Sequence, residues 1–168
     1  MVRPELVLSS WKTIREDAAQ AVEDFSAQDL SFRATPDLMS FGEAARHILE
    51  AGHALSGLLL AGVDDMTAPD FREKMGQLAA QIPKTEGPGA LAREMRSALD
   101  ASIAKLSAQP AEFFSGEITR FDGQRVTRLE MLQFIKEHEL THRSLLFLYL
   151  RLKGIVPPTT RRRMKAKA

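Results

Sequence analysis

The sequence predicts an all-α protein, a single domain built as a bundle of four helices. Four long segments carry apolar residues at intervals of three and four positions, which is the spacing of one helix face. The chain has 168 residues, a length that suits one domain with one core. Because four amphipathic helices must bury their apolar faces, packing against one another is the most economical arrangement.

The first two helices are indicated by apolar periodicity and by a capping signal. The first is predicted from one apolar face, formed by Val7, Trp11, Ile14, Ala18, Ala21 and Phe25. The second is expected to begin after Ser40, because Ser40 as the N-cap and Glu43 three positions later form a capping box. Its apolar face continues to about Ala61.

The third helix is expected to start near Pro88, and the fourth after Thr127. Thr127 and Glu130 form a second capping box, and Gly154 followed by two prolines marks the end of the fourth helix. The long connection between the second and third helices contains a pattern for a short helix near residues 71–80. The "FDGQ" segment before the fourth helix indicates a turn with room for a short hairpin.

Composition excludes several classes of protein. There is no cysteine, so disulfides, thiolate metal ligands and a cysteine nucleophile are ruled out. No apolar run reaches the length of a membrane span and the N-terminal residues lack the apolar core of a signal peptide, so we expect a cytoplasmic protein with no membrane partner.

The last ten residues, "TTRRRMKAKA", carry five positive charges and no negative charge. The rest of the chain then has 23 − 5 = 18 basic residues against 22 acidic ones, a net charge of −4. Because the segment lacks aromatic residues and the body has no basic excess, we expect no nucleic-acid partner. The prediction is a bundle over residues 1–158 and a disordered basic tail over 159–168.

Two histidines on the fourth helix point to a metal. "HELTH" at residues 138–142 matches H-E-x-x-H, the pattern of helical zinc-peptidase sites. Both histidines fall on the predicted inward stripe of this helix, which comprises Met131, Ile135, His138, His142, Leu145, Tyr149 and Leu152. Each buried imidazole would need its own hydrogen-bond partner, whereas one shared metal ion would satisfy both. A metal site is therefore favoured over two separate core histidines.

A third ligand is available on the second helix. His47 lies on the same predicted face as Ala44 and Ala51, small residues that would leave room for a metal. His53 follows six positions later, about 240° around the helix, so it cannot share that face. The predicted ligands are therefore His47, His138 and His142.

The peptidase hypothesis fails on its remaining parts. No Asp, Glu or His follows His142, where a peptidase of this pattern needs its third ligand, and no sheet edge is predicted to hold an extended peptide. Glu139 has two interpretations: a catalytic general base acting on water, or a surface residue paired with Arg143 one turn later. The second is favoured because Glu139 lies about 100° around the helix from His138.

Three segments resemble the DinB/YfiT-like family. "HELTHRSLLFLYLRLKGIVPP" resembles the closing helix of the family, "SFGEAARHILEAGHAL" its second helix and "FDGQRVTRLEML" the segment that enters the last helix. The resemblance covers nearly the whole chain. It implies an up-down-down-up four-helix bundle of the DinB/YfiT type, with a divalent metal on His47, His138 and His142. Zinc or nickel is the implied metal, and iron or manganese is the next choice for these ligands.

The resemblance also implies a metal-dependent enzyme, a transferase, isomerase or hydrolase that acts on a small molecule with water or a low-molecular-weight thiol such as bacillithiol or mycothiol. The metal would act as a Lewis acid or lower the pKa of a bound water or thiol. Many members have Gly-Gln after "HR", where this chain has Ser144 and Leu145, so no substrate is carried over. The alternative is a non-catalytic ligand-binding or stress-response module that the metal stabilises.

Assembly and substrate choice are expected to depend on two further regions. Leu6, Leu8 and Phe25 place apolar groups beside the core stripe of the first helix, and with the resemblance they predict a homodimer. The long loop after the second helix, with Asp64 and Phe71, is expected to border the metal site and to determine the substrate. Asp65 belongs to the same loop.

Overall fold

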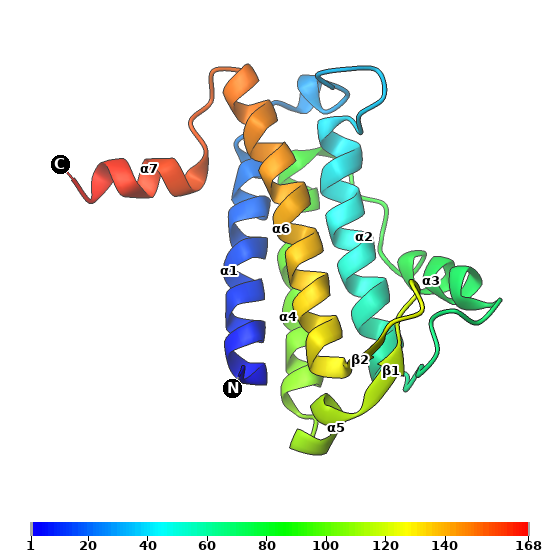
Figure 1. The fold of residues 1–168 in the computed structure, drawn as a ribbon. Coiled ribbons are helices and arrows are strands. Elements are labelled where there is room, and N and C mark those ends of the chain that lie inside the picture. The colour runs from blue at the N-terminus through cyan, green and yellow to red at the C-terminus, as the bar shows by residue number, and fades with distance from the viewer. Residues whose placement is uncertain (1, 168) are drawn as a thin grey trace.

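The computed structural model describes residues 2–167, and its elements are predominantly helical (Figure 1). The long helices are α1 (Pro4–Glu23), α2 (Phe41–Leu60), α4 (Gly87–Ser107) and α6 (Arg128–Leu152). The short elements are η1 (Ala27–Asp29), α3 (Phe71–Ala79), α5 (Ala111–Ser115), β1 (Glu117–Thr119), β2 (Arg125–Thr127) and α7 (Pro158–Lys165). Within residues 2–167, no helix is both long enough and apolar enough to cross a membrane.

The long helices lie side by side. α1 packs against α4 and α6, and α2 packs against α4 and α6 on the other side. α1 and α6 run in one direction, whereas α2 and α4 run in the opposite direction (Figure 1). α2 and α6, the two helices that carry the predicted ligands, are therefore antiparallel neighbours.

Local signals set the ends of the two helices that form the site. The Ser40 hydroxyl accepts a hydrogen bond from the Glu43 backbone N–H, and the Glu43 carboxylate accepts one from the Ser40 N–H. Thr127 and Glu130 form the same reciprocal pair at the start of α6. Gly154 follows α6 with φ +75°, a conformation that glycine adopts without steric cost. Both predicted capping boxes and the predicted end of α6 are confirmed.

The predicted short elements also form. α3 occupies residues 71–79, and β1 and β2 pair antiparallel with Ile118 opposite Val126. Gly123 lies in the turn between the strands with φ +81°. The loop after α2 joins this hairpin, because the Met66 N–H donates to the Thr119 carbonyl and the Thr119 N–H donates to the Asp64 carbonyl. The hairpin and α3 therefore border one side of the bundle.

The core consists of two apolar clusters. One gathers around Phe25, Phe41 and Tyr149, and the other around Trp11, Leu58 and Met131. Buried polar side chains lie between them, notably Arg15 and Glu139, which are 2% and 1% exposed. The histidines of α6 lie along the chain between Ile135 of the second cluster and Leu146 of the first. A polar layer thus crosses the bundle at the level of the candidate site.

The predicted disordered tail over residues 159–168 differs from the structure, because Pro158–Lys165 forms helix α7. α7 projects from the bundle on the side of α1 (Figure 1). Arg161 donates to Asp24 and Arg162 donates to the buried carboxylate of Asp17. These ion pairs with α1 give the basic segment a partner that its composition does not reveal.

Two predictions about apolar faces are also corrected. The buried face of α6 is wider than the predicted stripe, because Leu146 and Leu150 are buried beside it, and it ends before Leu152, which is 55% exposed. Leu8 of α1 and Phe25, which follows the helix, lie in the protein's own core, and of the three residues considered only Leu6, at 52% exposure, remains at the surface. The apolar surface of α1 therefore supplies less support for a dimer than its sequence suggests.

Candidate metal centre

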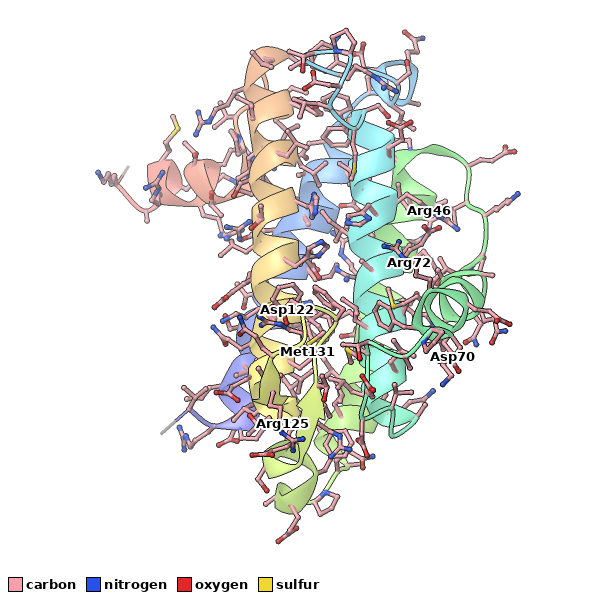
Figure 2. All side chains as sticks on the ribbon, turned by 45° about the vertical axis from the view of Figure 1, so that its right-hand side comes forward. Arg46, Asp70, Arg72, Asp122, Arg125 and Met131 are labelled. Atoms are coloured by element: carbon pink, nitrogen blue, oxygen red, sulfur yellow. The ribbon has the colours of Figure 1, made fainter. Side chains whose placement is uncertain are left out.

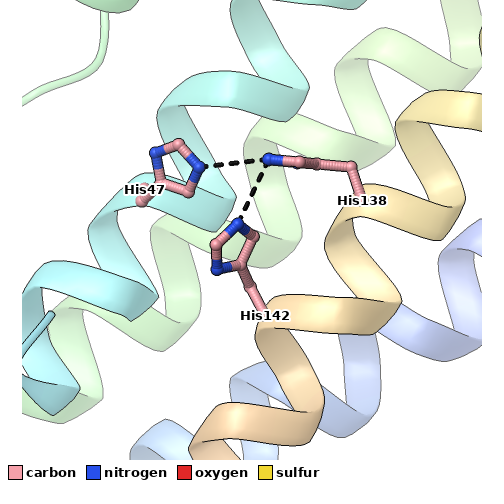
Figure 3. Close-up of side chains that lie close together, drawn as sticks. All are labelled: His47, His138 and His142. Carbon is pink, nitrogen blue, oxygen red and sulfur yellow. Dashed lines mark hydrogen bonds between the residues drawn. The ribbon is translucent and has the colours of Figure 1, made fainter. Parts of the chain in front are cut away.

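The three predicted ligands converge between α2 and α6 (Figure 3). His47 comes from the second turn of α2, whereas His138 and His142 come from successive turns of α6. The Nε2 atom of His138 lies 3.2 Å from the Nε2 atom of His47 and 3.2 Å from that of His142. All three side chains are partly buried, so the cluster is protected by the bundle yet open at one side.

The separations fit a shared cation better than a hydrogen-bonded cluster. A neutral imidazole has one N–H, so His138 Nε2 can donate to one of its two neighbours but not to both. Metal–nitrogen bonds of about 2.0–2.1 Å place two ligand nitrogens about 2.9 Å apart at a right angle and about 3.4 Å apart at a tetrahedral angle. The observed 3.2 Å lies between these values. These two separations, with all three ligand atoms within 4.8 Å of one another, are compatible with a shared divalent metal.

The electrostatics of the cluster favour neutral imidazoles. Burial, together with the neighbouring His142 and His47, lowers the pKa of His138 to about 4. Burial also lowers the pKa of His47, although nearby Glu50 opposes the shift, and burial followed by His47 lowers the pKa of His142. Neutral imidazole is the form that binds a metal, so the three ligands are ready for coordination at neutral pH.

His53 lies outside the cluster, as predicted. Both of its ring nitrogens are shielded from solvent and have no hydrogen-bond partner among residues 2–167. It stands six residues after His47 on α2, which turns it towards a different neighbour. His53 is therefore a suitable control position when the three converging histidines are substituted.

Glu139 corrects the favoured interpretation, since it is not a surface partner of Arg143. Its side chain is buried, with Oε1 accepting from Arg15 Nε at 2.6 Å and Oε2 accepting from Arg15 Nη2 at 2.8 Å. Trp11 Nε1 donates to the same Oε2 atom at 2.6 Å. Both carboxylate oxygens are occupied by these donors, so the geometry does not favour the general-base role. Arg143 instead donates to Asp17.

Arg15 is the residue at this level that the sequence interpretation missed. Besides Glu139, its guanidinium donates to the carbonyl of Ile48 on α2 and to that of Met95 on α4. Ile48 follows His47 in the sequence, and Glu139 follows His138. The buried Arg15 side chain of α1 therefore binds a backbone carbonyl of α2, one of α4 and the Glu139 carboxylate of α6, close to the three histidines. The sequence contains one indication that Arg15 is buried: it lies one turn after Trp11, next to the apolar stripe.

Gly52 is required by this arrangement. A Cβ atom at position 52 would lie 2.7 Å from Arg15 Nη2, closer than side-chain carbons approach other atoms. It would also lie 3.4 Å from the Trp11 ring. The glycine therefore lets α2 approach the buried ion pair closely.

Comparisons with known proteins agree with this architecture. The sequence pattern of the DinB family matches residues 1–168. The uncharacterized protein YjoA of Bacillus subtilis (strain 168) is 23% identical over 154 residues, which span 92% of this chain and 93% of YjoA. The crystal structure of YjoA, described as a DinB-like protein, is similar with a TM-score of 0.68 over 89% of this chain and 92% of that one.

A second solved structure shares the fold at lower identity. The crystal structure of the mycothiol-dependent maleylpyruvate isomerase is 12% identical, with a TM-score of 0.60 over 85% of this chain and 60% of that chain. This chain therefore spans less than two thirds of the isomerase. The family match over the full length carries the assignment: the chain belongs to the DinB family.

Proposed function

We propose that this protein is a metal-dependent enzyme with a three-histidine site, acting on a small molecule as a transferase or isomerase with a low-molecular-weight thiol as cosubstrate. The observation that carries the proposal is the convergence of three Nε2 atoms at a partly exposed position between two helices. The antiparallel directions of α1 and α2 and of α4 and α6 support the up-down-down-up bundle that the family resemblance implies.

The ligand set favours chemistry over a purely structural metal. Among residues 2–167 the cluster contains histidines alone, without a carboxylate to close the coordination sphere. Three protein ligands with further positions free are the arrangement of catalytic sites, whereas structural sites have four protein ligands. Zinc or nickel suits three imidazoles, and a divalent metal here would act as a Lewis acid that lowers the pKa of a water or thiol.

The chain's own residues hold the site in place. His138 and His142 stand one turn apart on α6, and the buried ion pair of Glu139 with Arg15 sets the rotation of that helix. The Phe134 ring lies beside His138, with centroids 6.3 Å apart and an interplanar angle of 24°. The absence of cysteine means that no protein thiolate competes with an external thiol.

The structural likeness to the mycothiol-dependent maleylpyruvate isomerase supports a thiol as cosubstrate. This likeness concerns the fold, and the use of a thiol cosubstrate by this chain is our proposal. Glu139 is not placed to act as a general base, because its carboxylate oxygens accept hydrogen bonds from Arg15 and Trp11. Activation by the metal then becomes the simplest source of a nucleophile.

The test begins with metal-free protein reconstituted with cobalt, whose visible spectrum reports changes in coordination. We expect one cobalt per chain, and a change in the spectrum when mycothiol, bacillithiol or 2-mercaptoethanol is added. His47→Ala should abolish the cobalt spectrum, whereas His53→Ala should preserve it. A site that binds cobalt but responds to no thiol or small anion would instead support the non-catalytic module, in which the metal joins α2 to α6.

A further inference from the structure

A cavity of about 450 Å³ lies where the loop after α2 meets α3 and the hairpin turn. It is lined by residues 66–69, Phe71, Arg72 and Phe121. All of these residues except Phe121, which lies in the hairpin turn, belong to the segment that the sequence singles out as a determinant of the substrate. Asp64 and Asp65 of the same loop have structural tasks, because Asp64 pairs with Arg128 and Asp65 accepts from the Thr67 backbone N–H and hydroxyl.

A row of aromatic rings connects this cavity to the histidine cluster. Phe71 stacks on Phe121 with centroids 6.1 Å apart and an interplanar angle of 27°. Phe121 contacts Phe134 at 5.4 Å, and Phe134 lies 6.3 Å from the His138 ring. The cavity wall is thus two ring contacts away from a predicted metal ligand. Phe134 and the histidines do not line the cavity, so the cavity and the histidine cluster are linked through these ring contacts.

The charge exposed in the cavity is positive. Arg72 is exposed and has neither a hydrogen-bond nor an ion-pair partner elsewhere in residues 2–167. No acidic residue lines the cavity, and Asp70 just before α3 and Asp122 of the hairpin turn pair with Lys74 and Arg120. Figure 2 shows Arg72 between α3 and α2. The Arg72 guanidinium is therefore free to bind an anion from solvent.

We propose that this cavity binds a carboxylate-bearing small molecule with a planar apolar group, and that it is the substrate pocket of the histidine site. Arg72 would hold the carboxylate, because a guanidinium matches the two oxygens of a carboxylate with two parallel hydrogen bonds. Phe71 and Phe121 would hold the planar group by ring contacts. The assignment as a substrate pocket rests on the metal-dependent function proposed above, whereas carboxylate binding itself does not.

The experiment measures binding of 3-phenylpropanoate and of its neutral amide, 3-phenylpropanamide, by ligand-observed NMR and calorimetry. The proteins are the wild type with and without bound metal, Arg72→Ala, Arg72→Lys and Phe121→Leu. Arg93→Ala is the matched control, because Arg93 is an exposed arginine on α4 that does not line the cavity. Circular dichroism checks that each variant is folded.

We expect the wild type to bind the acid roughly tenfold more tightly than the amide, which corresponds to one charge-assisted contact. Arg72→Ala should remove this preference, Arg72→Lys should retain part of it, and Arg93→Ala should leave it unchanged. Phe121→Leu should weaken both ligands alike. Equal binding of acid and amide by the wild type, or equal affinities of the Arg72→Ala and Arg93→Ala proteins for the acid, would overturn the proposal.

The metal-free arm separates the two proposals. If the protein takes up no metal but binds the acid in an Arg72-dependent way, the metal-dependent function fails and the carboxylate pocket stands. If metal binds as expected and the acid shows no dependence on Arg72, the pocket fails and the metal proposal stands.

Discussion

Replacing Glu139 with alanine removes the acceptor of three buried hydrogen bonds, two from Arg15 and one from Trp11. Arg15 is 2% exposed, so its charge would remain buried with only the Ile48 and Met95 carbonyls as partners. Breaking a buried ion pair from one side costs about 3–5 kcal/mol because the other charge is left uncompensated. For a chain of this size that corresponds to a fall in Tm of roughly 10 °C.

The assay is urea unfolding of metal-free protein, followed by circular dichroism and by the fluorescence of Trp11. Glu137→Ala is the control, since Glu137 is exposed on the same helix and its loss should cost within about 0.5 kcal/mol. Arg15→Met should destabilise as Glu139→Ala does. The double variant Arg15→Met/Glu139→Ala should lose much less than the sum of the two single losses, because no unpaired charge remains.

The result that would refute this reasoning is a Glu139→Ala loss as small as that of Glu137→Ala, or additive single losses in the double variant. Metal content adds a second criterion. Because Glu139 is not in the histidine cluster, the double variant should still bind one cobalt per chain when metal is saturating. Loss of metal from a folded double variant would show that Glu139 acts on the site itself.

Four further predictions follow from the same structure. His47→Ala, His138→Ala and His142→Ala should each lower metal content at least tenfold, measured by elemental analysis of protein purified without a nickel column, while full occupancy in any of them would contradict the three-histidine site. The pKa of His138 is lowered to about 4 in the folded protein, whereas its ordinary pKa is about 6.5. Its contribution to stability is therefore complete above about pH 6.5 and is lost as the pH falls towards 4. Urea unfolding of metal-free protein should show this loss, and a His138→Gln variant should show less of it. Light scattering should give about twice the chain mass of 18.7 kDa if the protein is the homodimer that the family resemblance implies, and 18.7 kDa would refute it. Deleting residues 159–168 should reduce the unfolding free energy by no more than about 1 kcal/mol, because Arg162 is largely exposed and Asp17 keeps Arg143 as a partner, and a truncated chain that fails to fold would contradict this estimate.

Local signals in the sequence were sufficient for most helix ends. The capping boxes at Ser40 and Thr127 act through residues three positions apart, and Gly154 ends α6 by its own backbone conformation. The facing of His47 towards His138 was also predictable, because helical periodicity places each residue on one side of its helix. Interactions of short range along the chain determine these features, so they can be inferred before the fold is known.

The interior position of Glu139 was decided by tertiary packing. Periodicity assigned one inward stripe to α6, but this helix packs against both α1 and α2 and so buries a wider arc of its surface. A carboxylate is tolerated there because Arg15, which is 124 residues away in the chain, supplies the compensating charge. The sequence of α6 alone does not indicate that Arg15 is the partner of Glu139.

Helix α7 and the cavity at Arg72 depend on the fold in the same way. Arg161 and Arg162 become ordered through carboxylates of Asp24 and Asp17, which the bundle presents on α1. The aromatic wall of the cavity joins Phe71 to Phe121, residues separated by the whole of α4. The sequence by itself determined the helices and the shared face of the three histidines, because those follow from neighbours along the chain. Only the tertiary structure decided the buried ion pair, the contacts of α7 and the cavity, because each is formed by groups that only folding brings together.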